Sequence, residues 1–158
     1  TISSISAQRA YFVGATPVVL PFYSGGAFNP ADSTTYLIGD RMDGVPSTTT
    51  GIRRIYVPMG MTQIQELIGH AFHANAGVTN EAVTVKLRRN GDSGTDMTVG
   101  TYQHNDTAII ANTYNSAFRF TDLGFAVTPG DYVEIVVVTP VWVANPTTVT
   151  YTGKAAGL

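Results

Sequence analysis

The hydrophobic residues of this chain recur at every second position along many short segments, which is the spacing of a strand. The clearest segment is residues 130–142, rich in Val, Ile and Tyr. One face of it carries Val133, Ile135 and Val137, and the other carries Tyr132, Glu134, Val136 and Val138. Both faces are apolar apart from one carboxylate, so we expect this strand to be covered on both sides. We predict that part of the second cover comes from another copy of the chain.

Alternating segments separated by Gly, Pro, Asn and Ser predict further strands. They cover residues 9–13, 17–23, 35–38, 52–59, 83–90, 97–103, 117–121 and 147–152, and Asn90-Gly91 is a turn. Residues 63–74 fit both helical and strand spacing, but Gly69 inside the segment favours a strand. Loops are expected at 24–33, 40–51 and 104–115. Eight to ten short strands and no helix predict an all-β sandwich or barrel.

The length of 158 residues predicts one folded domain, residues 9–158, preceded by an arm at residues 1–8. The arm is small and polar apart from Ile2 and Ile5. Thr1 is small enough to follow a removed initiator methionine, so we expect a complete gene product.

Composition and charge exclude several classes of function. The chain has no cysteine, which removes disulfides and thiolate chemistry and fits folding in the cytoplasm. Its net charge is −2 and only 13% of its residues are charged, so we expect neither nucleic acid nor a membrane as a partner. No apolar run approaches the length of a membrane span or a signal segment.

Several residue groups resemble sites, and each has a simpler interpretation. His70 and His73 would share a face on a helix, but on a strand they point to opposite sides, so no zinc site is predicted. His104 is expected to be an ordinary loop residue. No spacing marks a nucleophile and its base. We therefore predict no catalytic residue, no metal and no cofactor.

The remaining candidates are acidic loops, aromatic residues and arginine pairs. Asp40 with Asp43, and Asp92 with Asp96, fit turns better than calcium loops. The aromatic residues that are able to stack on sugar rings are Trp142, Tyr151, Tyr114 and Tyr102, for which packing is the favoured role. The pairs Arg53-Arg54 and Arg88-Arg89 place one arginine on each face, where a partner carboxylate at an interface would be Glu134, Glu66 or Glu81.

Four segments together resemble a known family. They are RRIYVP at 53–58, LRRNG at 87–91, PGDYVEI at 129–135, and Trp142 followed by NPT at 145–147. Over residues 9–153 the chain resembles the trimeric jelly-roll domains, similar to the tumour-necrosis-factor fold, of surface proteins of tailed-bacteriophage virions. The resemblance implies an antiparallel jelly roll in which the last long strand lies near a threefold axis. It therefore implies a trimer interface containing Tyr132, Glu134, Val136, Val138 and Trp142.

The function implied is that of a non-enzymatic structural protein of a phage virion, assembled in the host cytoplasm. The favoured form is a homotrimeric capsid decoration protein that binds the major capsid protein or another virion protein, with the arm bearing Ile2 and Ile5 as its anchor. One alternative is a receptor-binding head- or tail-fibre tip, whose loops 24–33, 40–51 and 104–115 contact host glycan. Another is a small glycan-active enzyme or lectin of cellular origin.

Overall fold

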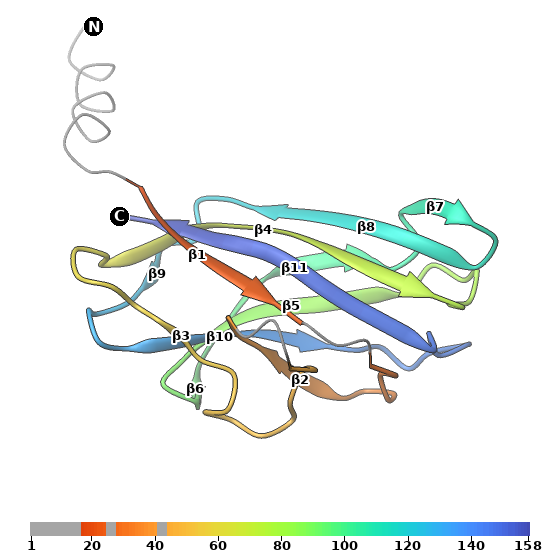
Figure 1. The fold of residues 1–158 in the computed structure, drawn as a ribbon, viewed down its shortest axis with the longest axis horizontal. Helices are drawn as coiled ribbons and strands as arrows, with labels where there is room; N and C mark the ends of the chain where they lie inside the picture. Colours follow the sequence, from red (N-terminus) through yellow and green to blue (C-terminus); the bar gives the residue numbers. More distant parts are fainter. Residues whose placement is uncertain (1–16, 25–27, 41–43) are drawn as a thin grey trace, which may run out of the picture.

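The computed structural model describes residues 17–24, 28–40 and 44–158. These residues form two antiparallel sheets packed face to face, and no helix occurs among them (Figure 1). The predicted all-β sandwich is therefore confirmed. The predicted arm with Ile2 and Ile5, and the predicted strand at 9–13, lie outside the described residues.

Sheet A forms the upper layer in Figure 1. Its strand order is β1 (Val18–Tyr23), β11 (Thr148–Gly157), β4 (Gln63–Ala74), β8 (Thr113–Phe120) and β7 (Thr107–Ile110), with β9 (Phe125–Ala126) also paired to β4. Sheet B is the lower layer. Its order is β2 (Thr35–Ile38), β10 (Tyr132–Val138), β5 (Ala82–Arg89) and β6 (Asp92–Gln103), with β3 (Ile55–Tyr56) also paired to β10.

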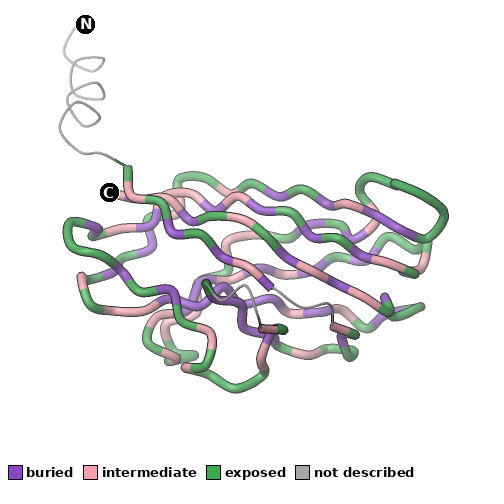
Figure 2. The backbone as a smooth tube through the Cα atoms, viewed as in Figure 1, coloured by how far each residue is buried: buried purple, intermediate pink, exposed green. Residues whose placement is uncertain are grey.

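The hydrophobic core lies between the two sheets, where the inward side of each strand is buried (Figure 2). Val133 and Ile135 of β10 are 0% exposed, as are Phe22 of β1 and Leu67 of β4. Burying each such side chain contributes about 1.5–3 kcal/mol relative to leaving it in water. The inward face predicted for β10 is thus the face that packs in the core.

The sequence located most strands but missed several of their ends. Residues 63–74, which fitted both helical and strand spacing, form strand β4 with the predicted bounds. The turn at Asn90-Gly91 has two positive φ angles, 53° and 70°, which are typical of a tight hairpin. The expected loop at 104–115 contains strand β7, and β6 begins at Asp92 rather than residue 97. The last strand was predicted to stop at residue 152, but β11 continues to Gly157 because it pairs with β1 and β4 along its length. Pairing on both sides outweighs the weak strand propensity of Gly and Ala.

The outward face of β10 is covered by the same chain, contrary to the prediction. Val136 and Glu134 are both 0% exposed in the single chain. Val136 lies opposite Leu37 of β2, whose backbone pairs with Ser47 of the loop between β2 and β3. The backbone N–H of Gly51 in the same loop donates to Glu134 Oε1 at 2.7 Å. The described part of this loop, residues 44–54, therefore supplies the cover at Glu134.

Most residues of the predicted trimer interface are not exposed on the surface of the single chain. Glu134, Val136 and Trp142 are buried within one chain, while Tyr132 and Val138 are half-buried. Trp142 also lies beyond the end of β10, because the strand stops before Pro140. The physical reason for expecting a second copy on β10 is therefore wrong, because Glu134 and Val136 are already buried within the single chain.

Candidate functional site

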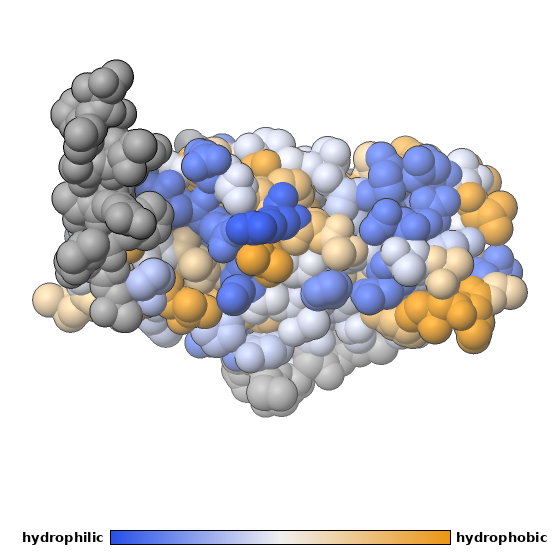
Figure 3. All heavy atoms as spheres, turned by 90° about the horizontal axis from the view of Figure 1, so that it is seen from above, coloured by the Kyte–Doolittle hydropathy of each residue, from blue (hydrophilic) through white to orange (hydrophobic). Residues whose placement is uncertain are grey.

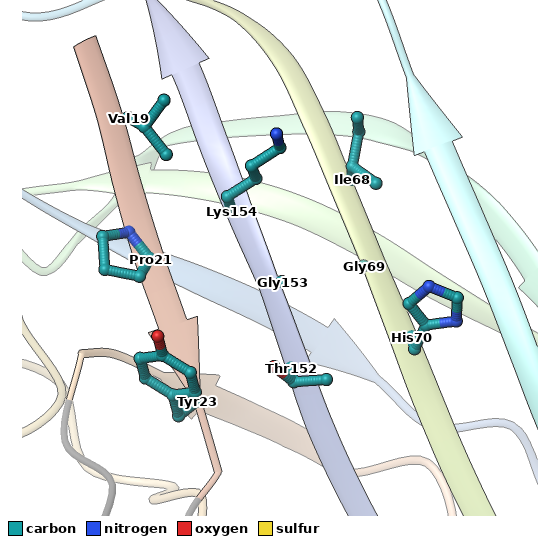
Figure 4. A pocket seen from close by; sticks show the side chains of 9 residues that line it. All are labelled: Val19, Pro21, Tyr23, Ile68, Gly69, His70, Thr152, Gly153 and Lys154. Atoms are coloured by element: carbon teal, nitrogen blue, oxygen red, sulfur yellow. The ribbon is translucent and has the colours of Figure 1, made fainter.

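A shallow open groove of about 350 Å³ crosses the outer face of sheet A over β1, β11 and β4 (Figure 4). Side chains that alternate outward from these three strands line it. The lining residues are Val19, Pro21, Tyr23, Ile68, Gly69, His70, Thr152, Gly153 and Lys154. Small-ligand sites occupy roughly 300–1,000 Å³, so this groove fits a small molecule or one unit of a larger one.

The register of the three strands sets the outward side chains in two rows. Tyr23 pairs with Thr152, which pairs with His70. Pro21 pairs with Lys154, which pairs with Ile68. Side chains of directly paired residues are roughly 5 Å apart and those in neighbouring rows roughly 7 Å apart, so one sugar-sized molecule spans both rows.

Two glycines form the centre of the groove. Gly153 pairs with Gly69, and the space that their side chains would occupy on the inner side is filled by the rings of Phe22 and Phe118. A Cβ on Gly153 would lie 2.3 Å from the Phe22 ring, and a Cβ on Gly69 would lie 2.4 Å from the Phe118 ring. The glycines let large core side chains approach the sheet backbone closely.

The groove combines a cation with hydroxyl groups and apolar carbon. Lys154 and His70 are exposed, and Lys154 forms no ion pair with any described residue. Tyr23 and Thr152 add hydroxyls. This set of groups is suited to holding a polar ligand of negative charge, since an ammonium and hydroxyls supply charged and neutral hydrogen bonds.

A second surface is the end of the sandwich where β4 leads into β5 and β10 leads into β11. Backbone hydrogen bonds join its loops: Ala76 N–H donates to Asn112 O at 2.9 Å, and Gly77 N–H donates to Ala144 O at 3.3 Å. The large apolar side chains exposed on these loops and the neighbouring hairpin are Val78 (73%), Ile109 (54%), Ile110 (68%), Val141 (70%) and Val143 (74%). We call these five residues the apolar end. Figure 3 shows hydrophobic residues gathered at the right-hand end of the molecule.

The apolar end carries little charge. The exposed carboxylates on its described loops are Asp32 and Asp106. Every lysine and arginine that the structure describes lies elsewhere, in loop 44–54 or on β5, β8 and β11. Exposed apolar side chains surrounded by polar groups are typical of surfaces that bind another macromolecule.

Two buried polar side chains, His104 and Glu81, support the apolar end from beneath. His104 is 0% exposed, and its Nε2 lies 2.9 Å from Gly77 O, while its Nδ1 lies 3.9 Å from Glu81 Oε2. The other Glu81 oxygen accepts a hydrogen bond from the backbone N–H of Val143. These side chains tie the β4–β5 loop to the β10–β11 loop. His104 is a loop residue as predicted, but its complete burial was not predicted.

A second buried histidine lies beside the first. His73 is 0% exposed, its Nε2 lies 3.2 Å from Tyr102 Oη, and that hydroxyl donates to Tyr151 Oη at 3.0 Å. Burial and, to a smaller extent, the nearby His104 together lower the pKa of His73 to about 3. Burial also raises the pKa of Tyr102 well above its usual value. His73 and Tyr102 therefore stay neutral inside the core near pH 7.

Glu134 is the buried carboxylate beneath loop 44–54. Burial raises its pKa, while the Gly51 N–H and the Arg88 guanidinium act in the opposite direction. Its Oε2 has no hydrogen-bond partner among the described residues. Arg88 lies opposite Glu134 but pairs in bidentate fashion with Asp96, at 2.7 and 3.0 Å.

Within the single chain, Arg88 and the predicted carboxylates Glu66 and Glu81 have other partners. Arg88 binds Asp96, Glu66 binds Arg119 and Glu81 lies beside His104, all within one chain. Asp92 caps its own turn, where its carboxylate accepts from Gly94 N–H at 2.8 Å. Asp40 is exposed, and Asp43 lies outside the described residues.

The strand placement predicted for His70 and His73 is confirmed, and the four aromatic residues considered for sugar stacking pack within the chain. His70 is exposed on sheet A and His73 is buried, so they lie on opposite faces of β4 as predicted. In the part of the chain that the structure describes, no three His, Asp or Glu side chains form a metal-binding group. The four aromatic residues considered for sugar stacking are buried: Trp142 (6%), Tyr151 (3%), Tyr114 (8%) and Tyr102 (5%).

Sequence reasoning missed the groove because it depends on which residues of three distant strands lie side by side. Tyr23, His70 and Lys154 are separated by tens of positions, and only the register joins them. The apolar end gave one signal, the run of apolar residues at 108–111 inside an otherwise polar segment.

The arrangement thus defines an antiparallel β-sandwich with an open groove on one face and an apolar end. Comparison with protein-family models, with curated proteins and with solved structures finds no match to this chain. Among the described residues, no helix has the length and apolar character needed to cross a membrane.

Proposed function

We propose that this chain is a jelly-roll structural protein of a phage virion surface, seated on another virion protein through its apolar end. The strand order supports the jelly roll. Leaving aside β3, β7 and β9, the other eight strands, renumbered 1 to 8 in chain order, give sheets 1-8-3-6 and 2-7-4-5. An eight-stranded double sheet with this order corresponds to two Greek keys wound together.

The observation that carries the structural role is the apolar end. Five aliphatic side chains that are 54–74% exposed lie on linked loops at one end of the fold. Burying one of them against a partner contributes about 1 kcal/mol or more to the free energy of attachment. The two exposed carboxylates, Asp32 and Asp106, favour a partner surface with cations at its rim.

The buried histidines favour a non-enzymatic role. His73 and His104 are both 0% exposed, and their hydrogen bonds go to core tyrosines and loop carbonyls. A general base needs contact with its substrate. These two side chains instead brace the core and the loops that carry the apolar end.

The assembly proposed is a homotrimer, which now rests on the family resemblance and not on β10. Light scattering of the full chain is expected to give three times the monomer mass. A monomer at micromolar concentration would contradict the trimer but not attachment through the apolar end.

Attachment is tested on virions. The chain is expected as a band on a gel of purified particles, and its absence there would contradict a virion role. Particles prepared without the chain are then mixed with recombinant protein. The double variant Val141→Thr and Val143→Thr should bind about tenfold more weakly, because polar hydroxyls replace methyls in the contact.

The matched control is Val45→Thr, an exposed valine (44%) in loop 44–54 and away from the apolar end. It should bind like the parent. Equal binding by the double variant and the control would show that the apolar end is not the surface that binds the virion. Deleting residues 1–8 in the same assay tests the predicted anchoring arm separately.

A second candidate function, a receptor-binding fibre tip that contacts host glycan, is favoured by the groove on sheet A. The residues concerned are on β1, β11 and β4 and not in the three loops that the sequence indicated. A few copies per particle together with sugar binding would favour this function over decoration.

A further inference from the structure

We propose that the groove on sheet A binds an acidic saccharide unit, a sugar ring carrying one carboxylate. This inference deepens the second candidate function and is independent of attachment through the apolar end. The groove is open along one face, so it admits a unit within a longer glycan (Figure 4).

The charge of the groove points to a ligand with a single negative charge. Lys154 projects from the middle strand, β11, and lies between Pro21 and Ile68 in its row. It is exposed and has no carboxylate partner among the described residues. An ammonium that is free of a protein partner binds a carboxylate with a charge-assisted hydrogen bond.

The rest of the lining suits the hydroxyls and ring carbons of a sugar. The second row places the Tyr23 hydroxyl, the Thr152 hydroxyl and the His70 imidazole across the sheet. Figure 4 shows Tyr23 and His70 at opposite sides of the groove with Thr152 between them. Val19, Pro21 and Ile68 supply the apolar surface on which the C–H groups of a ring pack.

A phosphate-rich ligand fits the groove less well. Phosphate sites use free backbone N–H groups at turns or helix ends. Here the backbone of β11 pairs on both sides, with β1 and with β4, so its N–H groups are used within the sheet. The single lysine of the groove neutralises the one negative charge of a carboxylate, but not the several negative charges of a nucleotide.

Galacturonic acid and its uncharged methyl ester are the probes, because they share the sugar ring and differ in charge and by one methyl group. Binding to the full chain is measured by chemical-shift changes in NMR titrations. The acid is expected to bind with a dissociation constant on the order of 1 mM, and the ester about tenfold more weakly. N-acetylneuraminic acid and galactose serve as a second acidic and neutral pair.

Three variants locate the site. Lys154→Gln should weaken binding of the acid about tenfold and leave the ester unchanged, and Thr152→Val should weaken both. Lys86→Gln is the matched control, since Lys86 is the only other lysine and lies on sheet B. It should bind both probes like the parent.

Equal affinity for acid and ester, or no effect of Lys154→Gln on the acid, would overturn the proposed site. Light scattering on the same samples gives a further test. Loss of an oligomer in the Lys154→Gln variant would show that the groove is covered by a second copy, which also overturns the saccharide site. If the chain binds the acid but is absent from virions, the saccharide site is supported and only the proposed virion role is contradicted.

Discussion

At the scale of single residues, the buried histidine His73 makes the stability of the fold depend on pH. It has no exposed surface, and burial lowers its pKa to about 3, whereas an unfolded chain binds this proton near pH 6.5. Between these values the unfolded state holds more protons than the folded state. The free energy of unfolding therefore falls as the pH drops from about 6.5 towards 3. The contribution of His73 to stability is fully present above about pH 6.5.

We predict that the contribution of His73 lowers stability by on the order of 2 kcal/mol between pH 7 and pH 4.5. Urea unfolding at the two pH values measures it. His73→Gln should be less stable at pH 7 but should lose less stability on acidification. His70→Gln, on the exposed face of the same strand, should change with pH much as the parent does. A parent-like pH slope in His73→Gln would contradict the prediction.

The residue pattern predicted the inward and outward sides of β10 correctly, but not what covers the outward side. Alternation assigns Val133 to one face and Val136 to the other, and both are buried. No local signal shows that residues 44–54 fold back to donate Gly51 N–H to Glu134. That contact joins positions 83 residues apart, so it depends on the tertiary fold.

At the scale of elements, loop 44–54 is tied to sheet B of the same chain, because Ser47 pairs with Leu37 through the backbone. Leu37 is 1% exposed in the single chain. Leu37→Ala should therefore lower the free energy of unfolding by about 2–5 kcal/mol, because a cavity replaces the side chain. The loss should be the same at all protein concentrations in thermal unfolding. A loss that grows on dilution would place Leu37 at an interface between copies instead.

The packing beneath the middle of sheet A depends on a glycine in β11, which lies between β1 and β4. An alanine Cβ at position 153 would lie 2.3 Å from both the Phe22 ring and the Ile68 carbonyl oxygen. Gly153→Ala should therefore destabilise the fold by about 1–3 kcal/mol or more. Thr152→Ala, one residue away and facing solvent, should cost far less. Calorimetric midpoints of the two variants compare the costs directly.

The elements were largely predictable, since strand spacing and turn residues are local signals. Strand β7 was missed because its four residues are all exposed and it pairs only with β8. The extension of β11 was missed because Gly153, Lys154 and Gly157 are poor strand formers that are held by two neighbouring strands.

At the scale of the whole molecule, the two candidate surfaces differ in what made them predictable. The groove needs the register of β1, β11 and β4, and no sequence motif encodes that register. The apolar end needs the ends of both sheets to converge. Its valines at 78, 141 and 143 are isolated in sequence, and each alone reads as an ordinary exposed residue.

The antiparallel pairing of β1 with β11 sets Val18 directly opposite Gly157. Among the described residues, the start of the first strand, β1, and the end of the last, β11, therefore lie side by side, so a short flexible linker would join them without disturbing either sheet. A circular permutant of residues 17–158, linked in this way and reopened at the Asn90-Gly91 hairpin, should fold with a near-parent circular dichroism spectrum. Failure to fold would mean that the hairpin at 90–91 must stay covalently closed for β5 and β6 to pair.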